Sequence, residues 1–157
     1  MIEAAFVMSV MANIPAECSL YKGQKETYCA PGTIGHYERG KDTKTISEAI
    51  ASAASDKRDA IEMAVYAAYE GQNRLDALGD KGRSHGPWQT LFPRVSAEGY
   101  LADWIEVRKH SIANCANNSP DTKLAQLARG WCNRGTQKVA KRWAVIEKLN
   151  EELSHHD

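Results

Sequence analysis

Apolar residues recur at intervals of three and four over most of this 157-residue chain, and one glycine-rich segment, residues 72–93, interrupts the pattern. That spacing places apolar side chains on one face of an α-helix, whereas closely spaced glycines and prolines end helices. The interrupting segment carries Gly79, Gly82, Gly86, Pro87 and Pro93. We therefore expect a mostly α (α+β) fold, in which helices surround one core and a glycine-rich loop or small β-hairpin is inserted.

Local capping signals predict where the helices begin and end. The run Thr45-Ile46-Ser47-Glu48 has the form of a capping box, which predicts a helix start. Asp56 is expected to cap a second helix, and Gly71 to end it. Further helices are expected from Ser96, from Ser119-Pro120 to Gly130, and from near Thr136 to the C-terminal region.

The first 44 residues divide into an apolar start and a loop-rich remainder. The apolar run 4–12 is far shorter than the roughly 20 residues that span a bilayer, so we expect no transmembrane segment. Only the acidic Glu3 precedes it, whereas a signal peptide starts with positive charge, and a buried helix is favoured over a cleaved signal. Prolines and glycines are frequent over residues 15–44. We expect a single domain, residues 1–157, with residues 1–44 as a loop-rich N-terminal extension.

Acidic and basic residues balance, with 20 Lys plus Arg against 20 Asp plus Glu. A neutral chain has no strong field that steers it toward nucleic acid or acidic membranes, and we expect neither partner. Basic residues gather in the C-terminal third, where they either attract an anionic cell-wall polymer or form a solvated helix face. They are Arg129, Arg134, Lys138, Lys141 and Arg142. No cofactor motif occurs, and we expect no cofactor.

The four cysteines form two local pairs in the sequence, Cys18 with Cys29 and Cys115 with Cys132. They are either small buried apolar residues or two local disulfides, and the local pairing is one of three possible connectivities. No Cys-x-x-Cys run occurs, and no histidine stands at a recognised metal-ligand spacing. We therefore expect no zinc or other metal site.

Glu70 is the residue that most strongly indicates chemistry. It ends an apolar helical stretch, Ala67-Ala68-Tyr69, just before Gly71. A carboxylic acid that protonates a leaving oxygen near neutral pH needs a raised pKa, which comes from apolar surroundings and from the lack of favourable charge partners. We expect both around Glu70, although a surface glutamate at a helix end is the alternative.

The segment after Glu70 carries polar and aromatic groups suited to a sugar. Asn73, Ser84 and Gln89 can exchange hydrogen bonds with hydroxyl and acetamido groups. Gly82 and Gly86 let the backbone pass close to a bulky substrate. Trp88 offers either a flat face for a sugar ring or a core side chain. Asp80 is either a second catalytic carboxylate or an ordinary turn residue.

These residues resemble a known signature. Glu70-Gly71-x-Asn73, followed by Gly82-Arg83-Ser84-x-Gly86-Pro87-Trp88-Gln89, resembles the lytic transglycosylases of the lysozyme-like superfamily. The similarity extends to Gly99-Tyr100-Leu101 and to Leu124-Ala125-x-x-Ala128-x-Gly130. It covers about residues 60–130. The run from Asp80 to Gln89 is also similar to invertebrate-type lysozymes. The residue after the glutamate is often serine in these families and is Gly71 here.

The resemblance implies a lysozyme-like catalytic domain that cleaves the β-1,4 bond between N-acetylmuramic acid and N-acetylglucosamine in peptidoglycan. Glu70 carries over as general acid/base and Asp80 as a nucleophile or charge stabiliser. Asn73, Ser84, Gly86, Trp88, Gln89 and Tyr100 are the expected substrate-binding residues. With Glu70 alone, the product is a 1,6-anhydro sugar, and with Asp80 it is a reducing sugar.

Two other readings stay open. The chain is alternatively a non-catalytic lysozyme-fold module, such as a component of a phage particle or secretion apparatus, or a small extracellular disulfide-stapled domain unrelated to sugars. The enzyme is expected to act at the bacterial cell wall, in an extracellular, periplasmic or virion-associated setting, and a phage lysin is favoured. The sequence leaves the oligomeric state open.

Overall fold

A computed structural model describes residues 1–15, 18–20, 27–29, 33–34, 37–38, 40–114 and 137–153. Within these residues the protein is mostly helical, which confirms the predicted fold class. The α-helices are α1 (Ala4–Asn13), α2 (Thr43–Ala53), α3 (Lys57–Gly71), α4 (Ala97–Asn114) and α6 (Gln137–Leu153).

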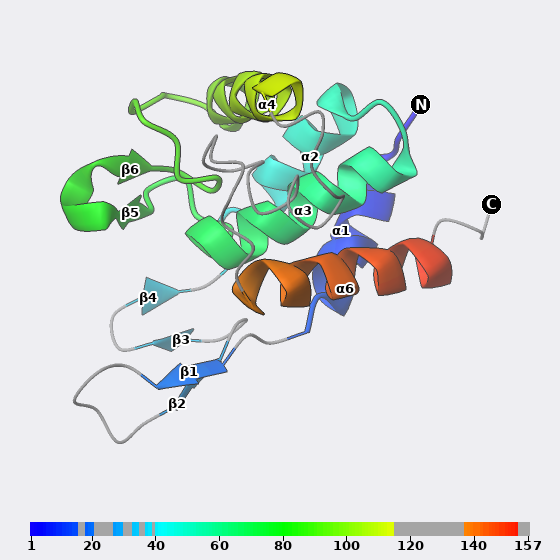
Figure 1. Cartoon of the computed structure of the whole chain (residues 1–157), viewed down its shortest axis with the longest axis horizontal. Helices are drawn as coiled ribbons and strands as arrows, with labels where there is room; N and C mark the ends of the chain where they lie inside the picture. Colours follow the sequence, from blue (N-terminus) through cyan, green and yellow to red (C-terminus); the bar gives the residue numbers. More distant parts are fainter. Residues whose placement is uncertain are drawn as a thin grey trace.

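The strands in the described residues pair into three small antiparallel hairpins. Strands β5 (Leu78–Gly79) and β6 (Ser84–His85) flank a 3₁₀ turn, η1 (Asp80–Gly82), and form the hairpin predicted within residues 72–93. The other two hairpins lie in the region expected to be loop-rich, apart from the helices (Figure 1). They are β1 (Cys18–Leu20) with β2 (Thr27–Cys29), and β3 (Thr33–Ile34) with β4 (Tyr37–Glu38).

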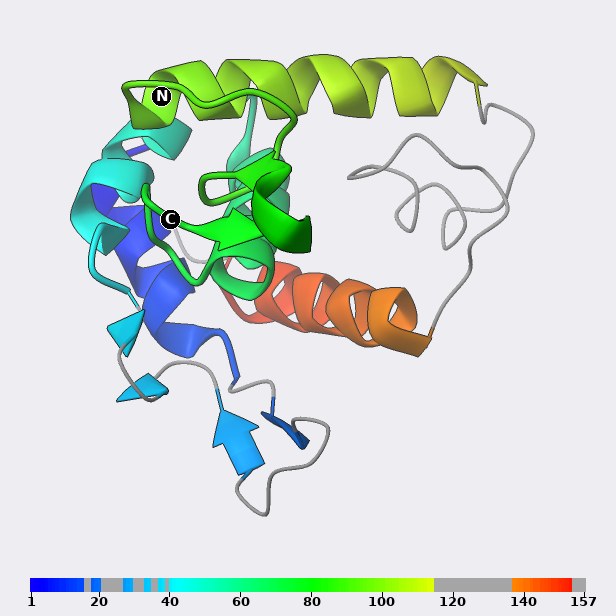
Figure 2. The same cartoon turned by 90° about the vertical axis from the view of Figure 1, so that its left-hand side faces the viewer.

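Helix α3 is the central element of the fold. Figures 1 and 2 show it between α4 on one side and α6 on the other, with α1 and α2 alongside. The Tyr66 ring of α3 lies 5.6 Å from the Trp104 ring of α4, and Ile146 and Leu149 of α6 are buried. The buried residues of α3 are Ala60, Ile61, Met63, Ala64, Val65, Tyr66, Ala67 and Gly71. Because so few of its positions face solvent, α3 fixes where the flanking helices dock.

Two of the predicted helix caps are confirmed. The Asp56 carboxylate accepts a hydrogen bond from Asp59 N at 2.8 Å, and Ser96 Oγ accepts one from Gly99 N at 3.1 Å. Each side chain thereby pairs an N–H group that the helix itself leaves without a partner.

The capping box predicted at residues 45–48 is wrong. Helix α2 begins two residues earlier, at Thr43, and Ser47 is fully buried within it. The residue before the helix is Asp42, whose carboxylate accepts a hydrogen bond from Leu75 N at 2.7 Å. The residue before α2 is thus tied to the segment after α3 by a tertiary contact, which the local sequence pattern does not contain.

The N-terminal region is only partly the extension that the sequence predicts. Val7 and Val10 of α1 are fully buried, which confirms the predicted buried helix. Helix α1 packs against α2 and α3, so the loop-rich part begins after it. Within the described part of the chain, no helix has both the length and the apolar character of a membrane span.

Several predictions concern residues outside the described part of the chain. They are the helix from Ser119-Pro120 to Gly130, the cysteines Cys115 and Cys132, and the basic residues Arg129 and Arg134. The side chain of Lys138 is likewise not described. The backbone of the first hairpin is described, and its register places Cys18 directly opposite Cys29.

Candidate functional site

Glu70 is the second-last residue of α3, which ends at Gly71 as the sequence predicts. The helix stops because the next two residues, Gln72 and Asn73, adopt left-handed backbone with φ of 55° and 53°. The N–H groups of both residues donate to Ala67 O, which is the usual way a helix end satisfies its last carbonyls. Glu70 thus lies where the central helix passes into the glycine-rich segment.

Gly71 allows the glycine-rich segment to press against the helix end. A Cβ built on Gly71 would lie 2.4 Å from Pro87 Cα and 2.6 Å from Gly86 O. Backbone atoms cannot move aside as a flexible side chain can, so a serine at this position would not fit. Glycine therefore stands here, where the similar families often have serine, because the backbone of Pro87 and Gly86 leaves no room for a side chain.

The corner formed by residues 86–89 is fixed from two sides. Gly86 has a φ of 76°, and a Cβ there would lie 2.7 Å from the ring of Tyr100, which is only 5% exposed. Gln89 donates from Nε2 to Gly86 O at 2.9 Å, and its Oε1 lies 2.0 Å from where a Cβ on Gly79 would be. Gly86, Gln89 and Tyr100 therefore hold the hairpin in place, and their contact with a substrate stays a prediction.

Trp88 is a core residue. Of the two predicted roles, the core side chain is confirmed and the exposed face for a sugar ring is wrong. The side chain is 1% exposed, and its Nε1 donates to Met63 O at 2.9 Å. Its ring centroid lies 6.5 Å from that of Trp104. At this exposure, neither face of the ring is open to a ligand.

The remaining predicted site residues are spread over the hairpin and the helix end. Asn73 is 8% exposed and donates from Nδ2 to Met11 Sδ at 3.3 Å. Ser84 is half-buried in β6, opposite Gly79. Asp80 is exposed in η1, where it has a φ of 48°. These positions fit a turn residue at Asp80, and its catalytic role stays a prediction.

The carboxylate of Glu70 forms a buried ion pair with Arg142 of α6. The two side chains are 13% and 3% exposed, respectively. The Arg142 guanidinium also lies over the rings of Tyr66 and Tyr69, 5.8 and 5.4 Å from their centroids. Burial raises the pKa of Tyr66, so its hydroxyl stays protonated at any physiological pH.

This pair corrects one expectation about Glu70 and one about Arg142. The carboxylate is shielded from solvent as expected, but it has a charge partner, whereas the sequence led us to expect none. Arg142 is 2% exposed and does not belong to a solvated face. A signal was present in the sequence, because Arg142 precedes the buried Ile146 and Leu149 by four and seven positions, on the same helix face.

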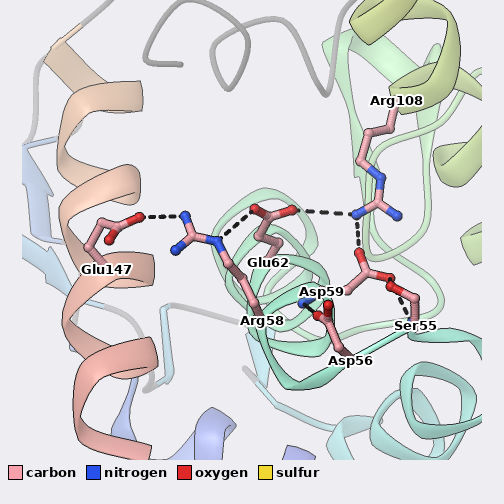
Figure 3. Close-up of polar contacts among 7 residues, drawn as sticks. All are labelled: Ser55, Asp56, Arg58, Asp59, Glu62, Arg108 and Glu147. Carbon is pink, nitrogen blue, oxygen red and sulfur yellow. Dashed lines mark hydrogen bonds and ion pairs between the residues drawn. The ribbon is translucent and has the colours of Figure 1, made fainter. Parts of the chain in front are cut away.

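A second charged cluster, which the sequence did not suggest, joins α3 to both flanking helices (Figure 3). Arg58 of α3 contacts Glu62 at 3.6 Å and pairs with Glu147 of α6. Arg108 of α4 contacts Glu62 at 3.5 Å and also pairs with Asp59. We call these five residues the arginine-carboxylate cluster.

Glu62 is the acid of this cluster that contacts both arginines. Its side chain is 17% exposed, and burial raises its pKa even though Arg108 and Arg58 oppose the shift. Glu62 stands eight residues before Glu70 on α3, so the two side chains leave the helix axis about 80° apart. It could have been noticed as the charged position that interrupts the buried run 60–67.

The described residues contain no group of three or more His, Cys, Asp or Glu side chains placed to hold a metal ion. Comparisons of the chain with protein-family models, with curated proteins and with solved structures found no match.

Proposed function

We propose that this protein is a glycosidase that cleaves the β-1,4 bond between N-acetylmuramic acid and N-acetylglucosamine in peptidoglycan, with Glu70 as general acid/base. The observation that supports the proposal is the placement of Glu70. Its carboxylate is only 13% exposed, and it lies at the helix end against which the hairpin corner packs. The proposed place of action is the bacterial cell wall, with delivery as a phage lysin.

The proposed reaction uses the two protonation states of one carboxyl group in turn. Glu70 first donates a proton to the glycosidic oxygen, and its carboxylate then accepts a proton from the oxygen that attacks the anomeric carbon. Arg142 stabilises the carboxylate and so favours the second step. The first step requires that glycan binding loosens the contact with Arg142, so that the carboxyl group can carry its proton.

The attacking oxygen decides the product. With Glu70 as the sole carboxylate, the 6-hydroxyl of the muramic residue attacks and a 1,6-anhydro sugar forms. With Asp80 as a second carboxylate, water attacks and a reducing sugar forms. Because Asp80 is exposed in a turn, we propose the anhydro route. Chromatography and mass spectrometry of digested peptidoglycan distinguish the two products.

Replacement of Glu70 by glutamine tests the proposal. We expect Glu70→Gln to clear peptidoglycan suspensions at least about 100-fold more slowly than the wild type, because the general acid is lost. Glu62→Gln is the matched control, since Glu62 lies on the same helix, has a similar exposure of 17% and also contacts arginines. It should clear at nearly the wild-type rate. Clearing by Glu70→Gln at the rate of this control would refute the assignment.

The buried ion pair also favours a second candidate, a non-catalytic module that binds or builds part of a phage particle or secretion apparatus. In that case Glu70 and Arg142 serve only to fasten α3 to α6. The two candidates differ in a direct way. A non-catalytic module would leave purified peptidoglycan uncleaved at any concentration, and at most it would sediment with it.

A further inference from the structure

Phe92 is the most exposed aromatic residue among those whose side chains the structure describes. It is 57% exposed, whereas every other aromatic side chain in this part of the protein is buried or half-buried. Leu91 and Val95 beside it are exposed as well, at 69% and 106%. Exposed apolar side chains that occur together on a folded protein mark a surface that contacts a partner.

The segment that carries Phe92 is fixed at both ends. Thr90 and His85 exchange two backbone hydrogen bonds of 2.8 and 2.9 Å, which attach the segment to the hairpin. Ala97 at the start of α4 is fully buried, and Pro93 restricts the backbone between these two ends. Figures 1 and 2 show this link between the hairpin and α4 on the outside of the molecule. The segment therefore presents Phe92 at a defined place on the surface.

A stacked arginine orients the ring of Phe92. The Arg94 guanidinium lies over the ring, 5.8 Å from its centroid. Asp103 of α4 holds this guanidinium by accepting hydrogen bonds from Nε at 2.6 Å and from Nη2 at 3.1 Å. Because a guanidinium stacked in this way covers one face, the 57% exposure leaves the rest of the ring accessible. A ring that is already oriented loses little freedom when a ligand binds.

Phe92 follows the hairpin that packs against the helix end carrying Glu70. The backbone of Gly86 lies against that helix end. Phe92 follows Gly86 by six residues, which span at most about 22 Å even when fully extended. The backbone bridge between His85 and Thr90 shortens this path. A glycan strand with one sugar at Glu70 can therefore reach Phe92 with another.

The chemistry around Phe92 suits a neutral ring-shaped ligand. A sugar ring carries faces of C–H groups, and these slightly positive groups are attracted to the negative face of an aromatic ring. The positive charge of Arg94 is already paired with Asp103, so it does not call for an anionic ligand. Trp88, which the sequence offered as the sugar platform, is buried in the core, whereas Phe92 lies four residues later in the same segment and is open.

We propose that Phe92 is a stacking platform for one N-acetyl sugar of the glycan strand that binds at Glu70. For its substrate class, this inference rests on the proposed glycosidase function. Leu91 and Val95 extend the apolar surface around the ring, and Arg94 keeps the ring in place.

Fluorine NMR tests the contact in the wild-type protein. The chain has two phenylalanines, Phe6 and Phe92, so labelling with 4-fluorophenylalanine gives two signals. The probe is a soluble tetramer of β-1,4-linked N-acetylglucosamine, which lacks N-acetylmuramic acid and so has no bond of the kind proposed to be cleaved. We expect a saturable shift of the Phe92 signal. Phe6 is the internal control, because Lys57 lies over its ring at 5.4 Å, and its signal should not move.

Two results of this titration would overturn the proposal. One is a Phe92 signal that stays unchanged or moves no more than the Phe6 signal. The other is a Phe92 signal that shifts with protein concentration in the absence of glycan and does not respond to the tetramer. That result would assign the exposed ring to contact between copies of the chain.

Variants at exposed positions test whether the flat ring is what binds. Phe92→Tyr keeps the ring and should bind the tetramer with nearly the wild-type affinity, as measured by isothermal titration calorimetry. Phe92→Leu keeps only apolar bulk and should bind about fivefold more weakly. Leu91→Ala is the matched control, because Leu91 is exposed beside Phe92, and it should bind as the wild type does. Equal affinities of Phe92→Leu and Leu91→Ala would refute stacking.

Failure of the platform is distinguishable from failure of the proposed function. If the wild type clears peptidoglycan and Phe92→Leu binds and clears equally well, only the role of Phe92 is refuted. If the tetramer shifts the Phe92 signal but the protein leaves peptidoglycan uncleaved, the platform is upheld and the glycosidase is refuted.

Discussion

Single residues around Glu70 show how a few atoms decide what the site can do. The helix end and the hairpin corner meet through backbone, and Gly71 is the position where no side chain fits. On another side, the buried guanidinium of Arg142 neutralises Glu70. Two predictions about single residues separate the contribution of packing to the free energy of unfolding from the contribution of the ion pair.

Gly71→Ala is expected to lower the free energy of unfolding by about 1–3 kcal/mol or more, because its Cβ would overlap the backbone of Pro87. Gly99→Ala is the control, since a Cβ there would meet Arg94 Cβ at 3.2 Å and the residue lies in helix α4. The control should be neutral or slightly stabilising. Urea denaturation followed by circular dichroism measures both, and equal effects would argue against the close backbone contact.

Arg142→Met is expected to cost about 3–5 kcal/mol of stability, because it leaves the buried Glu70 carboxylate without its partner. Combining it with Glu70→Leu should restore most of that loss, since an apolar pair can replace a buried ion pair. A double variant as unstable as the sum of the two single variants would show that the pair is not coupled. Denaturant unfolding of all four proteins provides this cycle.

Secondary-structure elements are joined at the next scale by charged contacts between helices. The arginine-carboxylate cluster connects α3 with α4 through Arg108 and with α6 through Arg58 (Figure 3). Glu62 contacts both arginines, at 3.6 Å and 3.5 Å, and so connects the two halves of the cluster. The stability of the helix assembly should therefore respond to the ionisation of Glu62.

Burial raises the pKa of Glu62 above its usual 4.5, so the folded protein holds this proton more tightly than the unfolded chain. The resulting stabilisation is fully present below about pH 4.5 and is lost as pH rises through the folded pKa. As pH rises from about 4.5 through the folded pKa, the wild type should therefore lose stability relative to Glu62→Gln. Thermal unfolding from pH 4 to 7 measures the difference.

Asp76 provides the opposite control. Hydrogen bonds from Arg74 lower its pKa, so its stabilisation is present above the unfolded pKa and is lost as pH falls through the folded value. The stability of the wild type relative to Asp76→Asn should therefore fall as pH falls, whereas its stability relative to Glu62→Gln should fall as pH rises. If Glu62→Gln and the wild type show the same pH dependence, the assignment to Glu62 is wrong.

The first hairpin yields a prediction from its backbone register. Cys18 stands opposite Cys29, and directly opposite residues in an antiparallel pair have Cα atoms about 4.5–5.5 Å apart, within the span of a disulfide. We predict that oxidised protein contains this bond, which would contribute about 3 kcal/mol. Alkylation under denaturing conditions, followed by peptide mass spectrometry, checks it. Alkylation of both residues without prior reduction would contradict the prediction, and Cys18→Ala serves as the control.

At the scale of the whole molecule, α3 connects the parts that matter for function. It contacts α1, α2 and α6 directly and meets α4 through the Tyr66 and Trp104 rings. Its C-terminal end carries Glu70, and the same end borders a cavity between α1, α2 and α3. A change in the packing of this helix would therefore reach both places.

The sequence by itself determined the features that depend on near neighbours in the chain. The apolar spacing predicted the core helices, and Asp56 and Ser96 mark the starts of α3 and α4 through bonds to residues three positions ahead. Glycines and prolines within residues 72–93 predicted the hairpin. Such signals can be read from the chain because helix periodicity and capping act over about four residues.

Tertiary structure alone decided which groups meet across the fold. Glu70 pairs with Arg142, which is 72 residues away, and Arg58 pairs with Glu147, which is 89 residues away. Trp88 became a core side chain because the hairpin folds back over α3, although its sequence context also suited an exposed loop. These contacts depend on how whole helices dock, and docking reflects the shape and burial of many side chains at once rather than any local pattern.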